Sequence, residues 1–193
     1  MLSNTETNTV VSKEFYTMSR AYEYVLHESG EAIHYLVYSG ENEFCFTNLG
    51  LIHVSQASAD ISYHVKRYSY NMHPLTGITL SKTEGTHYRI HFLMGETPFV
   101  LTVNDTSSAE LKTLFNSLHQ ISETLYENRI GYDYVRQSLE WISSTIGHSS
   151  TKEIDVKDTF TRLNQHSTDW VTTLKSHYYT TDYGYIFEKA ING

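Results

Sequence analysis

The sequence predicts an α+β protein: a seven-stranded antiparallel β-barrel capped by a C-terminal helix, followed by an α-helical hairpin and preceded by an N-terminal helix. Alternating apolar and polar residues, separated by turn residues, recur between residues 31 and 103. Apolar residues spaced by three and four then run from Leu111 to Ile146, and again from Val156 to Leu174. We therefore expect an N-terminal helix in 1–29, a barrel with its capping helix in 30–127 and a helical hairpin extension in 128–193.

The N-terminal helix is predicted from a single apolar face. Val11, Phe15, Met18, Tyr22 and Val25 follow one another at intervals of three and four residues, which places them on one side of an α-helix. Ser29 and Gly30 mark its end.

The barrel is predicted from seven short strands followed by a helix. They are expected at 31–38, 43–47, 51–55, 61–70, 75–82, 88–94 and 99–103. In the fourth, the apolar positions change register between Val65 and Tyr68, which predicts a β-bulge near Lys66 and Arg67.

A long helix is predicted after the barrel, beginning with the capping-box pair Ser107 and Glu110. Its heptad seam covers about 35 residues, so a continuous helix is about 50 Å long and extends past the barrel. A second capping box at Ser150 and Glu153 starts the other arm of an antiparallel hairpin.

We expect the flank of this hairpin to pair with other copies of the chain. The expected oligomerisation residues are Leu125, Asn128, Tyr132, Val135, Leu139, Ile142, Phe160, Leu163, Trp170 and Leu174. The aromatic segment 178–187 has no clear period, and its conformation is left open.

Three pieces of the barrel region resemble a known family. They are residues 46–52 (FTNLGLI), residues 66–70 (KRYSY) with Ile78 after them, and residues 99–101 (FVL) leading into Glu110 and Leu111. This stretch resembles the bacterial pleckstrin-homology-like (PH-like) family, and the helical remainder looks like the oligomerisation extension found in some relatives. The resemblance implies a seven-stranded barrel with a C-terminal helix, a tendency to form ring-like homo-oligomers, and no enzyme activity.

Enzyme and cofactor chemistry is not expected from the motifs. Neither a GxGxxG nor a GxxxxGK[ST] phosphate loop occurs, and no GxSxG nucleophile elbow is present. Cys45, the one cysteine, sits in an apolar strand where a buried and inert thiol is expected. The 11 histidines lack metal-site spacing, because Arg89 stands between His87 and His91. We predict no catalytic residue, no metal site and no cofactor.

The charge of the chain limits the kinds of partner that it can bind. The net charge is −8, which disfavours nucleic acids and anionic membranes. The first hairpin turn, residues 39–42, carries no basic residue, so phosphoinositide binding is not expected. Lys66 and Arg67 form the basic pair of the barrel and are the speculative ligand-binding residues, although a solvated pair on an exposed strand is the favoured explanation. No secretory signal or membrane span is visible, and one cysteine fits a reducing compartment, so a cytoplasmic location is expected.

The function predicted from these observations is that of a non-enzymatic scaffold or adaptor. It would form homo-oligomers, possibly rings, through its extension and bind an unknown protein or peptide through several displayed barrels. The alternative is a lipid or small-molecule binding module that uses the open end of the barrel. An enzyme ranks below both, because it would need an acid–base constellation that linear spacing hides.

Overall fold

The chain folds into two compact units. The structure is a computed structural model that describes residues 8–56, 62–82, 87–104, 107–148, 161–162, 165, 168–170, 172–173 and 180–192. One unit contains residues 1–125 together with 181–193, and the other contains residues 126–180. These boundaries differ from the three segments expected from the sequence, because residues 1–29 and 181–193 both belong to the unit that holds the strands.

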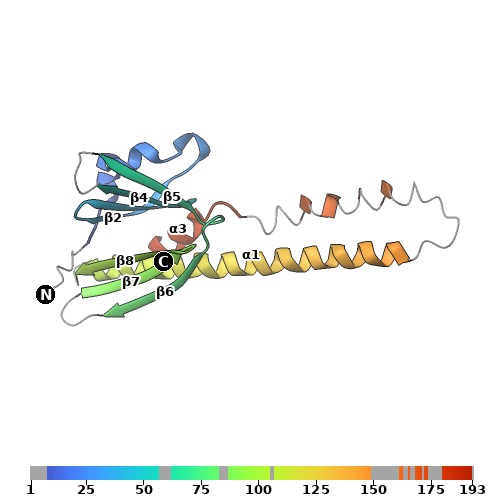
Figure 1. The fold of residues 1–193 in the computed structure, drawn as a ribbon. Coiled ribbons are helices and arrows are strands. Elements are labelled where there is room, and N and C mark those ends of the chain that lie inside the picture. Colours follow the sequence, from blue (N-terminus) through green and yellow to red (C-terminus); the bar gives the residue numbers. More distant parts are fainter. Residues whose placement is uncertain are drawn as a thin grey trace. The chain divides into compact units, whose positions relative to one another are not determined.

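Two antiparallel sheets build the first unit (Figure 1). The five-stranded sheet has the order β1-β2-β3-β4-β5 and the three-stranded sheet the order β6-β7-β8. The strands are β1 Thr9–Val10, β2 Ile33–Ser39, β3 Asn42–Thr47, β4 Gly50–Gln56, β5 Tyr63–Ser69, β6 Leu75–Lys82, β7 His87–Met94 and β8 Thr97–Asn104. The seven predicted strands correspond to β2 through β8 and are confirmed, while β1 is an additional eighth strand.

The barrel predicted from the sequence is not closed. At one edge, β1 is only two residues long, and the contact with β8 consists of a bridge between Asn8 and Val103. The Asn8 amide donates to the Thr102 carbonyl at 2.6 Å. At the other edge, the turn after β5 reaches β6 through Pro74, which has no amide hydrogen to donate. The described residues therefore form two facing sheets with open edges.

The bulge predicted near Lys66 and Arg67 is also wrong. The pairing of β5 with β4 is regular throughout, and the register shifts lie instead between Ile33 and Tyr35 and between Thr76 and Thr79. Val65 and Tyr68 point to opposite faces of one regular strand, and both faces are covered by apolar residues. The change of register in the sequence therefore reflects a sheet that is covered on both sides.

The main core lies between the two sheets and under the first part of α1, Ser108–His148. Leu111, Leu114, Leu118 and Ile121 are all 0% exposed, which confirms the capping helix predicted from their spacing. Aromatic side chains fill the space between the sheets. Phe99 stacks on Phe92 with ring centroids 5.3 Å apart and meets Phe44 edge-on at 6.1 Å.

The N-terminal helix predicted from the sequence is wrong. Residues 13–29 form three short 3-10 helices, Lys13–Met18, Arg20–Tyr24 and His27–Ser29, on the face of the five-stranded sheet that points away from β6–β8 (Figure 1). Tyr16 and Ala21 are buried there, whereas the expected core residues Phe15 and Met18 are 49% and 77% exposed. A continuous helix does not form because the sheet binds this backbone directly: the Ala21 amide donates to the Glu43 carboxylate at 3.0 Å.

The C-terminal helix α3, Gly184–Asn192, packs into the main core. Ile186 and Phe187 are 0% exposed, and the Phe187 ring stacks on the ring of His34 from β2, with centroids 4.9 Å apart and planes 12° apart. The Tyr183 amide donates to the Asn48 carbonyl at 2.9 Å. The described part of the segment whose conformation the sequence left open, residues 180–187, therefore ends in a short helix that belongs to the barrel.

Two barrel histidines should make the first unit sensitive to acid. Burial lowers the pKa of His34, helped by Lys13 and opposed by Glu188 and Asp182, and burial followed by Lys66 lowers the pKa of His53. The unfolded chain therefore takes up protons first. The stabilisation is complete above the ordinary histidine pKa of about 6.5 and is lost as the pH falls toward the folded-state values. Urea unfolding at several pH values should show this decline, and His34→Phe should make the decline shallower. An equal slope in that variant would contradict the assignment.

Candidate functional site

A buried carboxylate organises one end of the five-stranded sheet. The Glu31 side chain is 0% exposed, and its oxygens accept hydrogen bonds from the Thr47 hydroxyl at 2.7 Å and the Leu26 amide at 2.7 Å. The Arg67 guanidinium completes the set, with Nη2 at 2.8 and 2.9 Å from the two carboxylate oxygens. A buried charge is stable only when it is paired and hydrogen-bonded in this way. Glu31 therefore joins the N-terminal segment to β3 and β5.

The two basic residues proposed as a ligand site point in different directions. Because Lys66 and Arg67 are neighbours on a regular strand, their side chains point to opposite faces of the sheet. Arg67 pairs with Glu31 and also donates to the Tyr24 carbonyl, while 37% of its side-chain surface stays exposed. Lys66 is exposed opposite His53. The geometry gives Arg67 a structural role at the edge of a pocket and leaves Lys66 on the surface.

The turn between β3 and β4 explains the FTNLG piece of the family resemblance. The Asn48 side chain accepts from the Ala32 amide at 2.8 Å and donates to the Asp182 carboxylate at 2.7 Å, so it holds β2 and the start of α3 to the same turn. At Gly50 a Cβ atom would lie 2.2 Å from the Tyr68 carbonyl oxygen. Glycine is required there because two strands approach each other closely.

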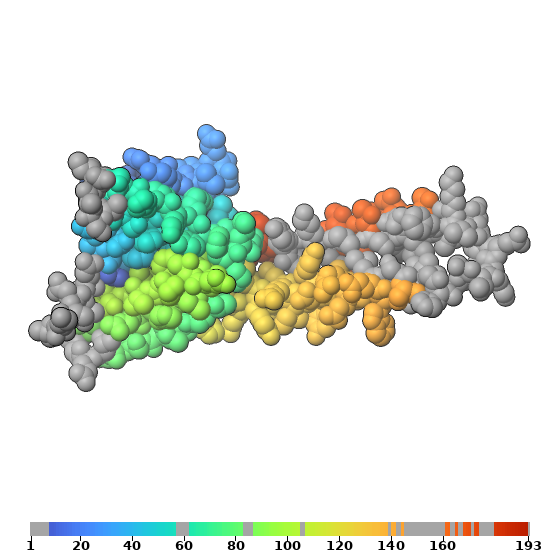
Figure 2. Space-filling model, viewed as in Figure 1, coloured from blue at the N-terminus to red at the C-terminus, as the bar shows by residue number. Residues whose placement is uncertain are grey.

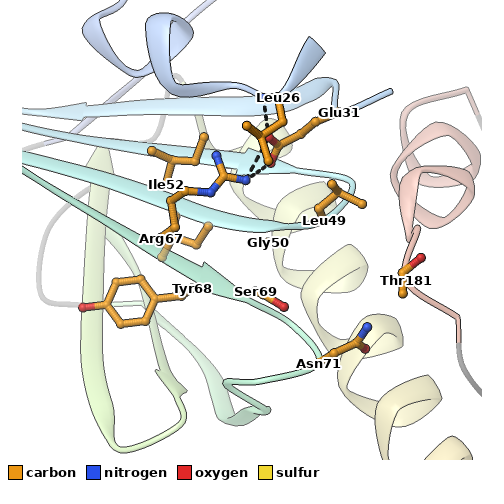
Figure 3. Close-up of a pocket in the computed structure, with 11 residues that line it drawn as sticks. Leu26, Glu31, Leu49, Gly50, Ile52, Arg67, Tyr68, Ser69, Asn71 and Thr181 are labelled. Atoms are coloured by element: carbon orange, nitrogen blue, oxygen red, sulfur yellow. Dashed lines mark hydrogen bonds and ion pairs between the residues drawn. The ribbon is translucent and has the colours of Figure 1, made fainter. Parts of the chain in front are cut away.

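A pocket of about 300 Å³ opens beside this turn (Figure 3). Its lining combines aliphatic side chains with a polar rim, and consists of Leu26, Glu31, Leu49, Gly50, Leu51, Ile52, Arg67, Tyr68, Ser69, Asn71 and Thr181. Figure 3 shows Arg67 and Glu31 directed toward each other on one side, with Asn71 and Thr181 on another. The volume is at the lower end of the range for small-ligand sites, and suits one side chain or a small apolar group.

The described residues offer little for catalysis. Cys45 is fully buried, and burial raises the pKa of its thiol, which keeps it protonated and unreactive. In the ranges that the structure describes, no group of three His, Cys, Asp or Glu side chains is placed to hold a metal ion. None of the described helices combines the length and the apolar character needed to span a bilayer.

The predicted oligomerisation residues fall on both described and undescribed parts of the extension. Leu125, Asn128 and Val135 on α1 are half-buried, and Tyr132 is 58% exposed. Trp170, which the sequence placed inside the hairpin, is 36% exposed. The side chains of Leu139 and Ile142 lie outside the described part, as do residues Phe160, Leu163 and Leu174 and the capping pair Ser150 and Glu153.

Comparison with known proteins finds relatives both of the extension and of the whole chain. Residues 133–193 match a family described as the YvbH-like oligomerisation region. The chain is also 32% identical over 187 residues to YvbH, an uncharacterized protein of Bacillus subtilis (strain 168), in a match that covers 95% of this chain and 91% of that protein. The chain belongs to the YvbH family.

The YvbH family assignment agrees with a solved structure of the same fold. A crystal structure of a bacterial PH-domain-containing protein from Exiguobacterium sibiricum 255-15 superimposes with a TM-score of 0.83 at 28% identity, covering 96% of this chain and 99% of that chain. The resemblance seen in the sequence is therefore confirmed: a PH-like domain is combined with a YvbH-like oligomerisation region.

Sequence reasoning missed the residues that organise the pocket. Glu31 was read as the first residue of a strand, and Asn48 as part of a tight connection. The available signal was a carboxylate at the edge of an apolar strand, facing a threonine in the next strand and an arginine further along. Only the strand pairing shows that these residues meet.

Arg67 should be important for stability, whereas its neighbour Lys66 should not. Arg67→Met leaves the Glu31 charge buried with two neutral donors, and should lower the free energy of unfolding by about 2 kcal/mol, less than for a fully buried pair because the arginine is partly exposed. Lys66→Met on the same strand is the control, with an effect within about 0.5 kcal/mol. Urea denaturation measures both. Equal effects of the two substitutions would contradict the structural role of Arg67.

Gly50 should not tolerate a side chain. Gly50→Ala forces the backbones of β4 and β5 apart, because the new methyl group would meet backbone atoms that cannot rotate away. The expected loss of unfolding free energy is about 1–3 kcal/mol. Ser55→Ala, on the same strand, should change it by less than about 0.5 kcal/mol. Thermal and urea unfolding of the two variants would compare them, and an unchanged stability for Gly50→Ala would show that the close approach is wrong.

Proposed function

We propose that this protein is a non-enzymatic, self-associating scaffold that assembles through its helical extension and displays several PH-like barrels to a protein or peptide. The match of residues 133–193 to an oligomerisation region supports self-association. The incomplete burial of the seam residues on α1 supports it as well, since Val135 and Asn128 are only half-buried in the single chain. Assembly through several such extensions is compatible with a ring.

Display of several barrels would strengthen weak binding. Each barrel offers the pocket beside Arg67, whose aliphatic lining and polar rim suit one apolar side chain of a peptide. A contact of this size alone gives weak affinity. When several barrels bind one multivalent partner, the later contacts form at a high effective concentration, and the overall affinity rises without any new contact.

A small-molecule module remains the second candidate, favoured by the aliphatic lining of the same pocket. Native mass spectrometry of the purified protein distinguishes the two. A bound small molecule or lipid in stoichiometric amount would favour the second candidate, and a clean protein mass would favour peptide binding.

Self-association is the first claim to test. Light scattering coupled to size exclusion, at tens of micromolar, should give a multiple of the chain mass, and a monomer there would contradict the proposal. Val135→Asp should weaken the assembly at least about tenfold, because it places a charge in the half-buried seam. Gln120→Asp adds the same charge at an exposed position of α1 within the first unit and should leave the assembly unchanged.

Deleting the extension is a poor substitute for these substitutions. A chain cut before residue 133 would also lose Tyr183, Ile186 and Phe187, which are at most 1% exposed in the core of the barrel. A truncated protein that fails to assemble would therefore report damage to the barrel as much as loss of the extension. Point substitutions on α1 avoid this ambiguity.

A further inference from the structure

The part of α1 in the second unit carries a second apolar face that the heptad seam does not include. Tyr126, Ile130, Tyr134 and Trp141 follow one another at intervals of four, four and seven residues. At 3.6 residues per turn these positions share one side of the helix, roughly opposite the seam that contains Val135. We call these four residues the aromatic stripe.

The three aromatic residues of the stripe are more exposed than the described residues of the seam. Tyr126, Tyr134 and Trp141 are 66%, 67% and 79% exposed, while Ile130 between them is half-buried. Figure 2 shows side chains of this part of α1, coloured yellow to orange, at the surface. Exposed aliphatic residues are common singly, but three large aromatic residues in one line mark a contact surface.

Polar residues border the aromatic stripe and separate it from the seam. On one flank, Arg136 pairs with Glu140 at 2.9 Å and lies 3.9 Å from the carboxylate of Asp133. On the other flank Glu127 and Ser138 are exposed. An apolar centre with a charged and polar rim is the usual composition of a protein–protein interface, and tyrosine and tryptophan are enriched at its centre.

We infer that the aromatic stripe is a second face, besides the seam, through which this helix contacts another copy of the chain. The inference rests on the proposed self-association and assigns it to particular residues. Tyr134 and Trp141 both lie within the matched oligomerisation region, which favours a second copy over an unrelated partner. Tyrosine and tryptophan each bury on the order of 200 Å², so two copies of the stripe supply on the order of 1,000 Å², enough for a specific contact.

Two apolar faces on one helix also affect the size of the assembly. The seam faces one neighbouring helix and the aromatic stripe faces another, so each extension can contact more than one other helix. Contacts of this kind build assemblies larger than a dimer when they continue from copy to copy around a closed ring.

The test is a double substitution in the full-length protein. Tyr134→Ser with Trp141→Ser removes the two aromatic residues within the matched region without touching the barrel. The dissociation constant, measured by sedimentation over a concentration series, should rise about 100-fold or more, as expected for interface aromatic residues. Asn116→Ser with Gln120→Ser is the control, because both residues are exposed on the part of α1 that belongs to the first unit, outside the aromatic stripe and its rim, and the net charge is unchanged. Circular dichroism and the unfolding midpoint of the barrel should match the wild type for both proteins.

The outcomes separate this inference from the proposed function. If the wild type assembles and the stripe variant assembles with the same dissociation constant, the aromatic stripe is not the contact, while self-association stands. A monomeric wild type at tens of micromolar would instead remove the proposed function itself. Flotation with anionic phospholipid vesicles by the wild type but not by the stripe variant, with assembly unchanged, would identify a membrane contact and overturn the inference.

Discussion

The Glu31 carboxylate is the interaction on which the first unit depends. Its oxygens bind a backbone amide of the N-terminal segment, a hydroxyl of β3 and a guanidinium of β5, so three segments distant in sequence meet at one charge. The desolvation of a buried carboxylate costs several kcal/mol, and only this complete set of donors offsets it. The pocket, the Leu26 side chain beside it and the irregular path of the N-terminal segment are consequences of meeting that requirement.

The five-stranded sheet is covered on both faces. Its strands were easier to predict than the N-terminal segment that covers one of these faces. Strand β3 is buried at nearly every position, since Phe44 and Phe46 face one core and Cys45 the other. Turn residues and local alternation set the strand limits, and these are visible in sequence. The N-terminal segment has helical spacing, but Glu43 and Glu31 bind its backbone amides. Tertiary hydrogen bonds therefore determine the conformation of this segment and override its local helical pattern.

The candidate site was less predictable than the fold, because it is formed by contacts across long sequence separations. Lys66 and Arg67 attracted attention as a basic pair, but strand geometry places them on opposite faces, and the partner that matters, Glu31, is 36 residues from Arg67. Asn48 and Asp182 are 134 residues apart, and no local period connects them. The aromatic stripe is hard to predict for a different reason: the heptad seam on the same helix already accounts for the helix by itself.

The chain segments on both sides of the extension belong to the barrel. The helix that enters the extension begins with four leucine and isoleucine side chains buried under the sheets, and the chain that leaves it ends in α3, also buried there. The chain on both sides of the extension therefore contributes to the core of the PH-like unit. Loss of either set of these contacts would weaken the barrel. Such coupling favours inheritance of the two parts as one protein, in agreement with relatives that match over almost the whole chain.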